Sequence, residues 1–138
     1  MHAMEKLAPF LPDISAARAD WSGSSPLPGG DFPVTGFDAL VGKLAADYAF
    51  LPLAQARRLV RAYGTRARMV LGNAKDSTDL GQDFGAGLSE AEVVYLMRWE
   101  WAVEAQDIVW RRSKLGLRMS AAQIDELGRF MRRQLALP

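Results

Sequence analysis

Charged side chains recur at helical spacing between residues 99 and 114, where they could serve as acids, bases or ion pairs. Asp107 and Arg111 stand four residues apart, which places them on one helix face as an ion pair. Glu100 and Glu104 continue that face, and neighbouring carboxylates could share acid–base work. A row of ion pairs on the outside of a helix has the same spacing. We favour this second interpretation, in which the charges are solvated and structural.

Arg112 lies on the apolar stripe of the same predicted helix, at about 100° per residue. The other members of that stripe are Trp101, Ala105, Ile108 and Leu115. An unpaired charge among apolar neighbours is costly, so we predict that Arg112 is at least partly buried and hydrogen-bonded to a carboxylate. The candidate partners that the sequence leaves open are Glu92, Glu100 and Asp79.

Three tryptophans, Trp99, Trp101 and Trp110, accompany these charges, and we expect them to be core or interface anchors rather than parts of a cofactor site. The residues expected to have a structural or interface role are Trp101, Asp107, Trp110, Arg111 and Arg112. We expect no catalytic, cofactor-binding or metal-binding residue in this chain.

The loop over residues 72–87, GNAKDSTDLGQDFGAG, invites two site interpretations. A phosphate-binding loop needs Lys followed by Ser or Thr at a helix start, whereas Lys75 is followed by Asp76. A calcium loop needs carboxylates at alternate positions, and Asp76, Asp79 and Asp83 are not spaced in that way. Turn formation by glycine and aspartate explains the composition better.

A dense group of arginines falls between residues 57 and 68: Arg57, Arg58, Arg61, Arg66 and Arg68. We predict that Arg57, Arg58 and Arg61 lie on the outer side of a helix. Two helices around Gly64 would resemble a helix-turn-helix. The second helix is short, however, and the net charge of the chain is only +1, so we do not expect nucleic-acid binding.

Composition excludes several kinds of site. The chain has 138 residues, no cysteine and one histidine, His2, so thiol catalysis and cysteine-ligated metals are excluded and a histidine site is not expected. No apolar run approaches the roughly 18 residues of a membrane span, and the start of the chain is not typical of a secretory signal. These observations favour a protein that faces the cytoplasm.

The helix signals predict one all-α domain over residues 1–138, a compact bundle of about five or six helices with two long Gly/Pro/Asp-rich loops. Residues 1–35 read as a mostly irregular connector that Trp21, Leu27 and Phe32 anchor on the helical core at 36–138.

Helices are predicted over 37–49 and 53–63, then a short one capped by Thr65. Ser89 with Glu92 and Ser120 with Gln123 have capping-box spacing. The first box opens one helix, or a bent pair of helices, that continues to Ser113 and is closed by Gly116. The second opens a final helix with Ile124, Leu127, Phe130 or Met131, and Leu135 facing inward.

An ordered set of short segments resembles the C-terminal helical domain of the FAD-dependent, aerobic, quinone-linked glycerol-3-phosphate dehydrogenases. The set includes Leu7-Ala8-Pro9-Phe10, Pro26-Leu27-Pro28-Gly29-Gly30, Ala62-Tyr63-Gly64, Leu71-Gly72-Asn73-Ala74, Asp79-Leu80-Gly81, Glu100-Trp101 and Trp110-Arg111-Arg112. The segments cover nearly the whole chain in one order. The resemblance implies a parent enzyme that binds FAD, oxidises glycerol 3-phosphate to dihydroxyacetone phosphate and passes electrons to a quinone; related oxidases use oxygen.

The family's flavin-binding Gly-x-Gly-x-x-Gly lies upstream of this region and is absent here. The resemblance therefore implies a non-catalytic C-terminal domain, with FAD in the parent enzyme and none in this fragment. Its expected partners are the upstream FAD and substrate domain and, through the parent, quinone and the membrane surface. The expected location is cytoplasmic, with peripheral membrane association through the parent. A homodimer is left open. The alternative is a free-standing helical module that binds protein or nucleic acid.

Overall fold

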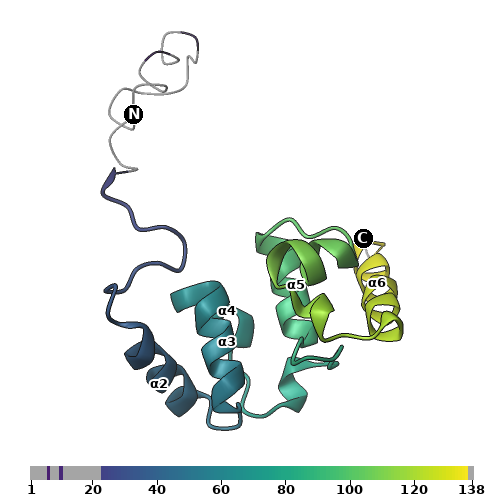
Figure 1. Ribbon diagram of the computed structural model, residues 1–138, viewed down its shortest axis with the longest axis horizontal. Helices are drawn as coiled ribbons and strands as arrows, with labels where there is room; N and C mark the ends of the chain where they lie inside the picture. The colour runs from purple at the N-terminus through teal and green to yellow at the C-terminus, as the bar shows by residue number, and fades with distance from the viewer. Residues whose placement is uncertain (1–5, 7–9, 11–22, 137–138) are drawn as a thin grey trace.

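The computed structural model describes residues 6, 10 and 23–136, and this part of the chain is helical (Figure 1). Its α-helices are α2 (Phe37–Asp47), α3 (Leu53–Tyr63), α4 (Ala67–Leu71), α5 (Glu90–Trp99) and α6 (Ala121–Leu135). Short 3-10 turns are η4 (Gly64–Arg66), η5 (Thr78–Leu80) and η7 (Leu115–Leu117), and η6 (Asp107–Arg112) is a π-helix. In the described range the only extended pairing is a bridge between Asp83 and Ser89. The all-α prediction is confirmed.

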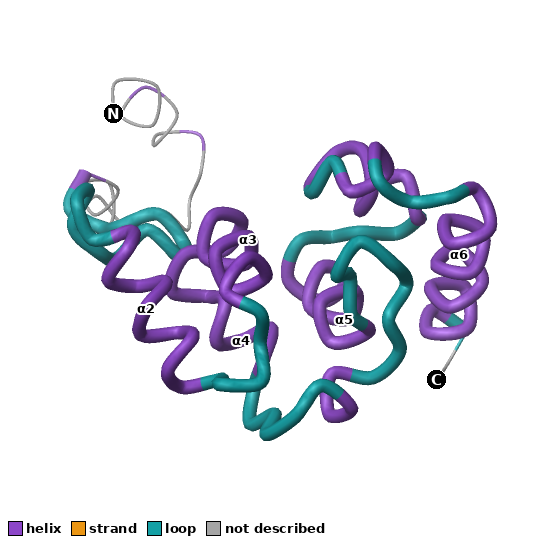
Figure 2. The backbone as a smooth tube through the Cα atoms, turned by 60° about the horizontal axis from the view of Figure 1, so that its bottom comes forward, coloured by secondary structure: helices purple, strands orange, loops and turns teal. Residues whose placement is uncertain are grey.

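The helices form two groups, α2 to α4 on one side and α5 to α6 on the other (Figures 1 and 2). The loop that carries η5 crosses between them (Figure 2). One cluster of buried apolar side chains is shared by both groups. Its most deeply buried members include Leu44, Leu59, Leu88, Leu96, Ile108, Leu127 and Met131. The site described below is therefore built on a packed core rather than on an isolated hairpin.

Helix α3 has the bounds predicted from its apolar spacing, because local signals fix both ends. Pro52 precedes its first residue, where a missing N–H costs nothing. Gly64 ends it with a φ of 55°, a conformation that favours glycine. The buried face consists of Ala56, Leu59, Val60 and Tyr63. Helix α2 ends at Asp47, two residues before the predicted end at Ala49.

The connector before α2 touches the end of α3 through two glycines. The Thr65 N–H donates to the Gly29 carbonyl at 3.1 Å. A Cβ on Gly64 would lie 1.9 Å from that carbonyl oxygen, so no larger residue fits without a shift. Of the predicted anchors, Phe32 is half-buried, whereas Leu27 is 81% exposed and does not anchor the loop. Trp21 lies outside the described residues.

Thr65 does not cap α4, contrary to the prediction. Its hydroxyl donates to the Asp31 carboxylate in the connector, and the η4 turn leads directly into α4. The capping box at Ser120 is complete, since Ser120 and Gln123 exchange side-chain to backbone hydrogen bonds. On α6, Leu127, Phe130 and Met131 face inward as predicted. Ile124 is half-buried. Contrary to the prediction, Leu135 is 55% exposed, and it is the last residue of the helix.

The other predicted capping box, at Ser89, is only half formed. The Glu92 N–H donates to the Ser89 hydroxyl at 3.3 Å, but the Glu92 side chain turns to α3 instead. There it accepts two hydrogen bonds from Arg58, at 2.7 and 2.6 Å, and one from the Tyr63 hydroxyl at 2.7 Å. Glu92 is fully buried. The prediction that Arg58 lies on the outer side of its helix is therefore wrong. Its side chain joins α3 to α5.

The cluster consists of two charged side chains, Glu92 and Arg58, and one neutral side chain, Tyr63. Burial, together with the charge of Glu92, raises the pKa of Tyr63 well above its ordinary value. The phenol therefore stays protonated and donates a hydrogen bond to Glu92. The second Nη of Arg58 also donates to the Gly87 carbonyl at 2.7 Å. Both oxygens of the buried carboxylate thus have partners, which a buried charge requires.

Candidate functional site

The helical stretch predicted from Ser89 to Ser113, as one helix or a bent pair of helices, is interrupted at Trp101 and forms two segments. Helix α5 ends at Trp99, and the N–H groups of Glu100 and Ala102 both donate to the Leu96 carbonyl at 3.1 Å. Between them Trp101 has a φ of 53°, a left-handed conformation that is rare for a bulky side chain. Its indole is 85% exposed. Trp101 therefore does not share a helical stripe with Arg112, and the prediction that it does is wrong.

Arg112 holds this turn from the other side. Its Nε donates to the Glu100 carbonyl at 2.9 Å, and one Nη donates to the same oxygen. The other Nη donates to the Asp107 carbonyl at 3.3 Å and lies 3.8 Å from the Asp107 carboxylate. Because Glu100 directly follows the last residue of α5, its carbonyl has no helical partner, and Arg112 satisfies it.

The prediction for Arg112 is thus confirmed in part. The side chain is partly buried, at 25% exposure, but its hydrogen bonds go to backbone carbonyls rather than to a carboxylate. The nearest carboxylate, 3.8 Å away, is that of Asp107, which was not among the proposed partners. Glu100 takes part only through its backbone carbonyl. Glu92 is engaged with Arg58, and Asp79 accepts the Lys75 N–H at 2.7 Å in the loop. The break at Trp101 changes the helical register, which is why spacing alone named the wrong partners.

Asp107 fixes the start of the next helical segment. Its carboxylate accepts the N–H groups of Val103 at 2.9 Å and Glu104 at 3.1 Å, as an acid in the first helical turn does in a capping box. It also pairs with Arg111 four residues on, as the spacing predicts. These backbone hydrogen bonds, with the Arg111 charge, lower the pKa of Asp107 to about 2. A carboxylate so engaged is ionised at neutral pH and is a poor proton shuttle.

We expect Asp107→Asn to destabilise the chain by about 1–2 kcal/mol at pH 7, the usual cost of losing a helix cap. The native pKa of Asp107 lies below the unfolded value of about 3.9, so its contribution is present above pH 4 and is lost as the pH falls toward 2. Denaturant unfolding of both proteins from pH 7 to pH 2 should show the difference shrinking. Asp125→Asn, at an exposed position, serves as the control. A difference that stays constant with pH would contradict this role.

The π-helix η6 places Trp110 against the following turn. The Ser113 N–H donates to the Ile108 carbonyl at 3.0 Å, five residues back, and its hydroxyl donates there at 2.7 Å. Lys114, with a φ of 59°, reverses the chain after η6, not Gly116 as predicted. Gly116 instead lies under the indole, where a Cβ would be 2.6 Å from the Cζ2 of Trp110. Trp110 is half-buried and has a packing role.

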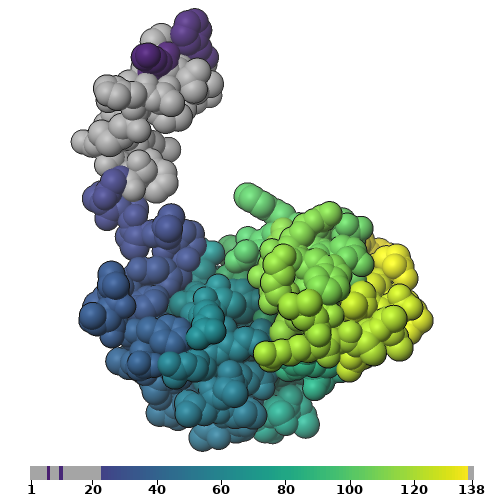
Figure 3. Space-filling model, in the orientation of Figure 1, coloured from purple at the N-terminus to yellow at the C-terminus, as the bar shows by residue number. Residues whose placement is uncertain are grey.

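The structure therefore brings together all five side chains predicted to have a structural or interface role. Asp107, Arg111 and Arg112 form an ion-paired support, Trp110 packs beside it, and Trp101 projects from the turn that it holds. We call residues 99–104 the Trp101 turn. Further exposed apolar side chains lie on or near it in sequence and space: Met69 at 46%, Trp99 at 57% and Val103 at 62%. In the space-filling view a group of atoms coloured for the region near residue 100 stands out from its surroundings (Figure 3).

The other candidate motifs have structural contacts. In the loop, Asp76 accepts the Thr78 N–H at 2.8 Å, as expected of turn chemistry. Arg57 pairs with Asp38 at 2.9 Å, and Arg68 pairs with Asp47. Over the described residues, no group of three His, Cys, Asp or Glu side chains is placed to hold a metal ion. None of the helices in that range has the length and apolarity needed to cross a bilayer.

Comparison with known proteins gives a consistent family. Residues 22–136 match the sequence model described as the C-terminal domain of alpha-glycerophosphate oxidase. A glycerol-3-phosphate dehydrogenase of Pseudomonas aeruginosa is 42% identical over 129 residues, 94% of this chain and 24% of that protein. The aerobic glycerol-3-phosphate dehydrogenase of Escherichia coli is 38% identical over 94% of this chain and 25% of its own length.

A third relative has a different substrate in its name. The D-erythritol 1-phosphate dehydrogenase of Brucella abortus is 33% identical over 87% of this chain and 23% of that protein. The chain thus spans about a quarter of the length of these relatives. The match to the family model covers most of the chain, and the resemblance seen in its short sequence segments is confirmed. This chain belongs to the family described as the C-terminal domain of alpha-glycerophosphate oxidase, with glycerol-3-phosphate dehydrogenases among its relatives.

Proposed function

We propose that this chain is the non-catalytic C-terminal domain of an FAD-dependent enzyme that oxidises glycerol 3-phosphate to dihydroxyacetone phosphate and passes electrons to a quinone. The family match and the names of the relatives support the reaction class. The D-erythritol 1-phosphate dehydrogenase supports a second substrate, a longer phosphorylated polyol. Substrate choice then belongs to the upstream part of the enzyme, which corresponds to the remaining length of the relatives.

The residues described here do not fit a flavin. FAD binding in such enzymes uses a strand, a glycine-rich turn and a helix that receives the pyrophosphate, and the described residues contain helices with one isolated bridge. The flavin when bound supplies the hydride chemistry, and we assign it to the upstream domain. The same holds for quinone contact and for peripheral membrane association from the cytoplasmic side, which this domain would share only through its parent.

We assign this domain a docking role, in which the Trp101 turn packs on the upstream domain. The observation that carries this role is an 85% exposed tryptophan in a left-handed backbone conformation, held there by Arg112. Strained residues persist where the surrounding structure fixes them, and they cluster at binding sites. Exposed Trp beside Arg is also typical of residues that dominate binding energy at interfaces.

The competing proposal is a free-standing helical module. The ion pairs of Arg57 and Arg68 reduce the positive surface available to nucleic acid. A protein-binding module would use the same Trp101 turn against a separate partner chain. The two proposals differ in covalent connection, because only the C-terminal domain has its partner on the same polypeptide.

The test expresses the longer polypeptide, with the upstream region joined to this chain, and a version that lacks residues 22–136. We expect bound FAD in the full polypeptide and none with the 138-residue chain alone. The shortened polypeptide should keep the flavin-binding motif but lose thermal stability by several degrees, since a covering domain has been removed. Stoichiometric FAD on the 138-residue chain, or equal thermal stability of the two longer proteins, would contradict the proposal.

A further inference from the structure

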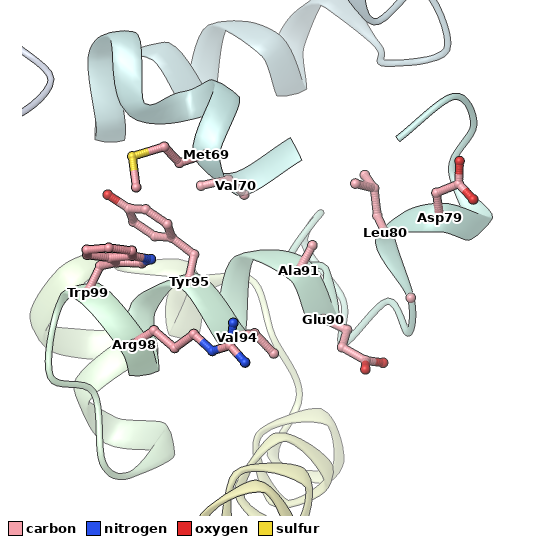
Figure 4. A pocket seen from close by; sticks show the side chains of 11 residues that line it. Met69, Val70, Asp79, Leu80, Glu90, Ala91, Val94, Tyr95, Arg98 and Trp99 are labelled. Atoms are coloured by element: carbon pink, nitrogen blue, oxygen red, sulfur yellow. The ribbon is translucent and has the colours of Figure 1, made fainter. Parts of the chain in front are cut away.

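A groove of about 320 Å³ lies between α4 and α5, next to the Trp101 turn (Figure 4). Helix α4 contributes Met69 and Val70 to it, and α5 contributes Tyr95, Arg98 and Trp99. The η5 turn closes its far end. Trp99 is 57% exposed and Met69 46% exposed, so the groove has large apolar side chains open to solvent along one edge.

Tyr95 in this groove has a buried hydroxyl with an unmet hydrogen-bonding capacity. The residue is 3% exposed, and among the buried side-chain atoms of the described residues its hydroxyl alone lacks a hydrogen-bond partner. Two other buried tyrosines are satisfied: Tyr48 donates to the Gly72 carbonyl and Tyr63 to Glu92, each at 2.7 Å. Buried hydroxyl groups are nearly always paired, so an unpaired one points to a missing partner.

The missing partner can reach Tyr95 from the groove. Its ring extends from α5 toward α4, and its hydroxyl lies beside the end of the Met69 side chain, with Trp99 next to the ring (Figure 4). Met69 is unbranched and partly exposed, and methionine readily changes rotamer to admit a contact. Movement of the Met69 side chain is the change by which we propose that a group in the groove reaches the hydroxyl.

The charges around the groove favour a neutral hydrogen-bond acceptor. The charged side chains that line the groove are one cation, Arg98, and two carboxylates, Asp79 and Glu90. An anionic ligand such as a phosphate would meet these two carboxylates, which repel it. A backbone carbonyl is neutral, accepts a phenol O–H and comes with apolar side chains that Trp99 and Met69 can contact.

We infer that this groove receives an extended apolar segment of the upstream domain, one of whose backbone carbonyls accepts a hydrogen bond from the Tyr95 hydroxyl. The inference rests on the proposed function. Its occupant follows from length and position: the relatives are about four times as long as the matched region, and the family description places that region at the C-terminus. Trp99 belongs to both the groove and the Trp101 turn, so the two surfaces form one continuous interface.

Tyr95→Phe tests this inference, with Tyr63→Phe as the matched control. In the 138-residue chain, Tyr95→Phe removes an unpaired hydroxyl, so the melting temperature should stay the same or rise. Tyr63→Phe breaks a formed hydrogen bond to Glu92 and should lower it by several degrees. A fall of equal size in both variants would show that Tyr95 already has a partner within this chain and would overturn the inference.

Hydrogen exchange on the longer polypeptide locates the interface. We expect the amides of α4 and α5 to exchange at least about fivefold more slowly there than in the 138-residue chain, a factor worth about 1 kcal/mol, and Tyr95→Phe should remove most of that protection. Protection of the Trp101 turn without protection of α4 and α5 would overturn the inference that the groove is occupied, and would leave the docking role intact. If the amides of α4, α5 and the Trp101 turn exchange at the same rate in the longer polypeptide as in the 138-residue chain, the docking role is overturned as well.

Discussion

Replacing Glu92 with alanine should destabilise the chain by about 3 kcal/mol or more, the largest effect we expect from one substitution. The Glu92 carboxylate is fully buried and accepts hydrogen bonds from Arg58 and Tyr63. Its removal leaves a partly buried guanidinium and a buried phenol without their partner, and breaking a buried ion pair from one side typically costs about 3–5 kcal/mol. Arg58 is 23% exposed, so water recovers part of its solvation and the lower end applies.

Denaturant unfolding of Glu92→Ala, read by the far-UV helix signal, measures this effect. The double substitution Arg58→Met with Glu92→Leu is the matched control, since replacing both charges by apolar side chains of similar volume is often neutral. We expect the double variant to recover the part of the loss that comes from the unpaired guanidinium, while the Tyr63 hydroxyl stays without its partner. Similar stability for Glu92→Ala and the native chain would show that the cluster is solvated and does not join α3 to α5.

Local signals account for what the sequence predicted well. Pro52 and Gly64 bound α3 through backbone restrictions that act within one residue, and the predicted bounds are correct. The capping box of Ser120 and Gln123 is equally local and is complete. The pair of Asp107 and Arg111 needs only one helical turn, and it forms. These features depend on neighbours in sequence, so no knowledge of the fold is required to predict them.

Features that depend on distant contacts were predicted poorly. Arg58 and Glu92 are 34 residues apart, and only the packing of α5 on α3 reveals that they meet. A signal was present, because Glu92 shares a helix face with Leu96 and is the one acid on that apolar face. Tyr95 carries no such signal, since an unpaired hydroxyl is visible only once its surroundings are known.

The Trp101 turn escaped prediction for a different reason. A left-handed residue after a helix is usually glycine or asparagine, and a tryptophan gives no warning of the turn. The helical stripe drawn through Trp101 and Arg112 therefore continued across a break. The carbonyl of Glu100 that Arg112 satisfies exists as a free acceptor only because the helix ends there. Predictions from local sequence patterns fail most often at strained residues of this kind, which are common at functional sites.

Trp101→Asn should separate folding from docking. Asparagine tolerates the left-handed conformation, and the exposed indole contributes little packing within the chain. The 138-residue chain should therefore keep its stability or gain up to about 1 kcal/mol from relief of strain. In the longer polypeptide the same change should weaken docking by about 2 kcal/mol or more, as loss of a central interface tryptophan does. Val34→Asn, at a fully exposed apolar residue of the connector, is the matched control.

The thermal unfolding of Trp101→Asn, measured both in the 138-residue chain and in the longer polypeptide, tests the docking role most directly. We expect an unchanged or higher melting temperature in the chain alone. In the longer polypeptide we expect this domain to unfold several degrees earlier than in the native protein, while Val34→Asn leaves both proteins unchanged. Equal behaviour of Trp101→Asn and the native protein in the longer polypeptide would contradict the assignment of the Trp101 turn as a docking surface.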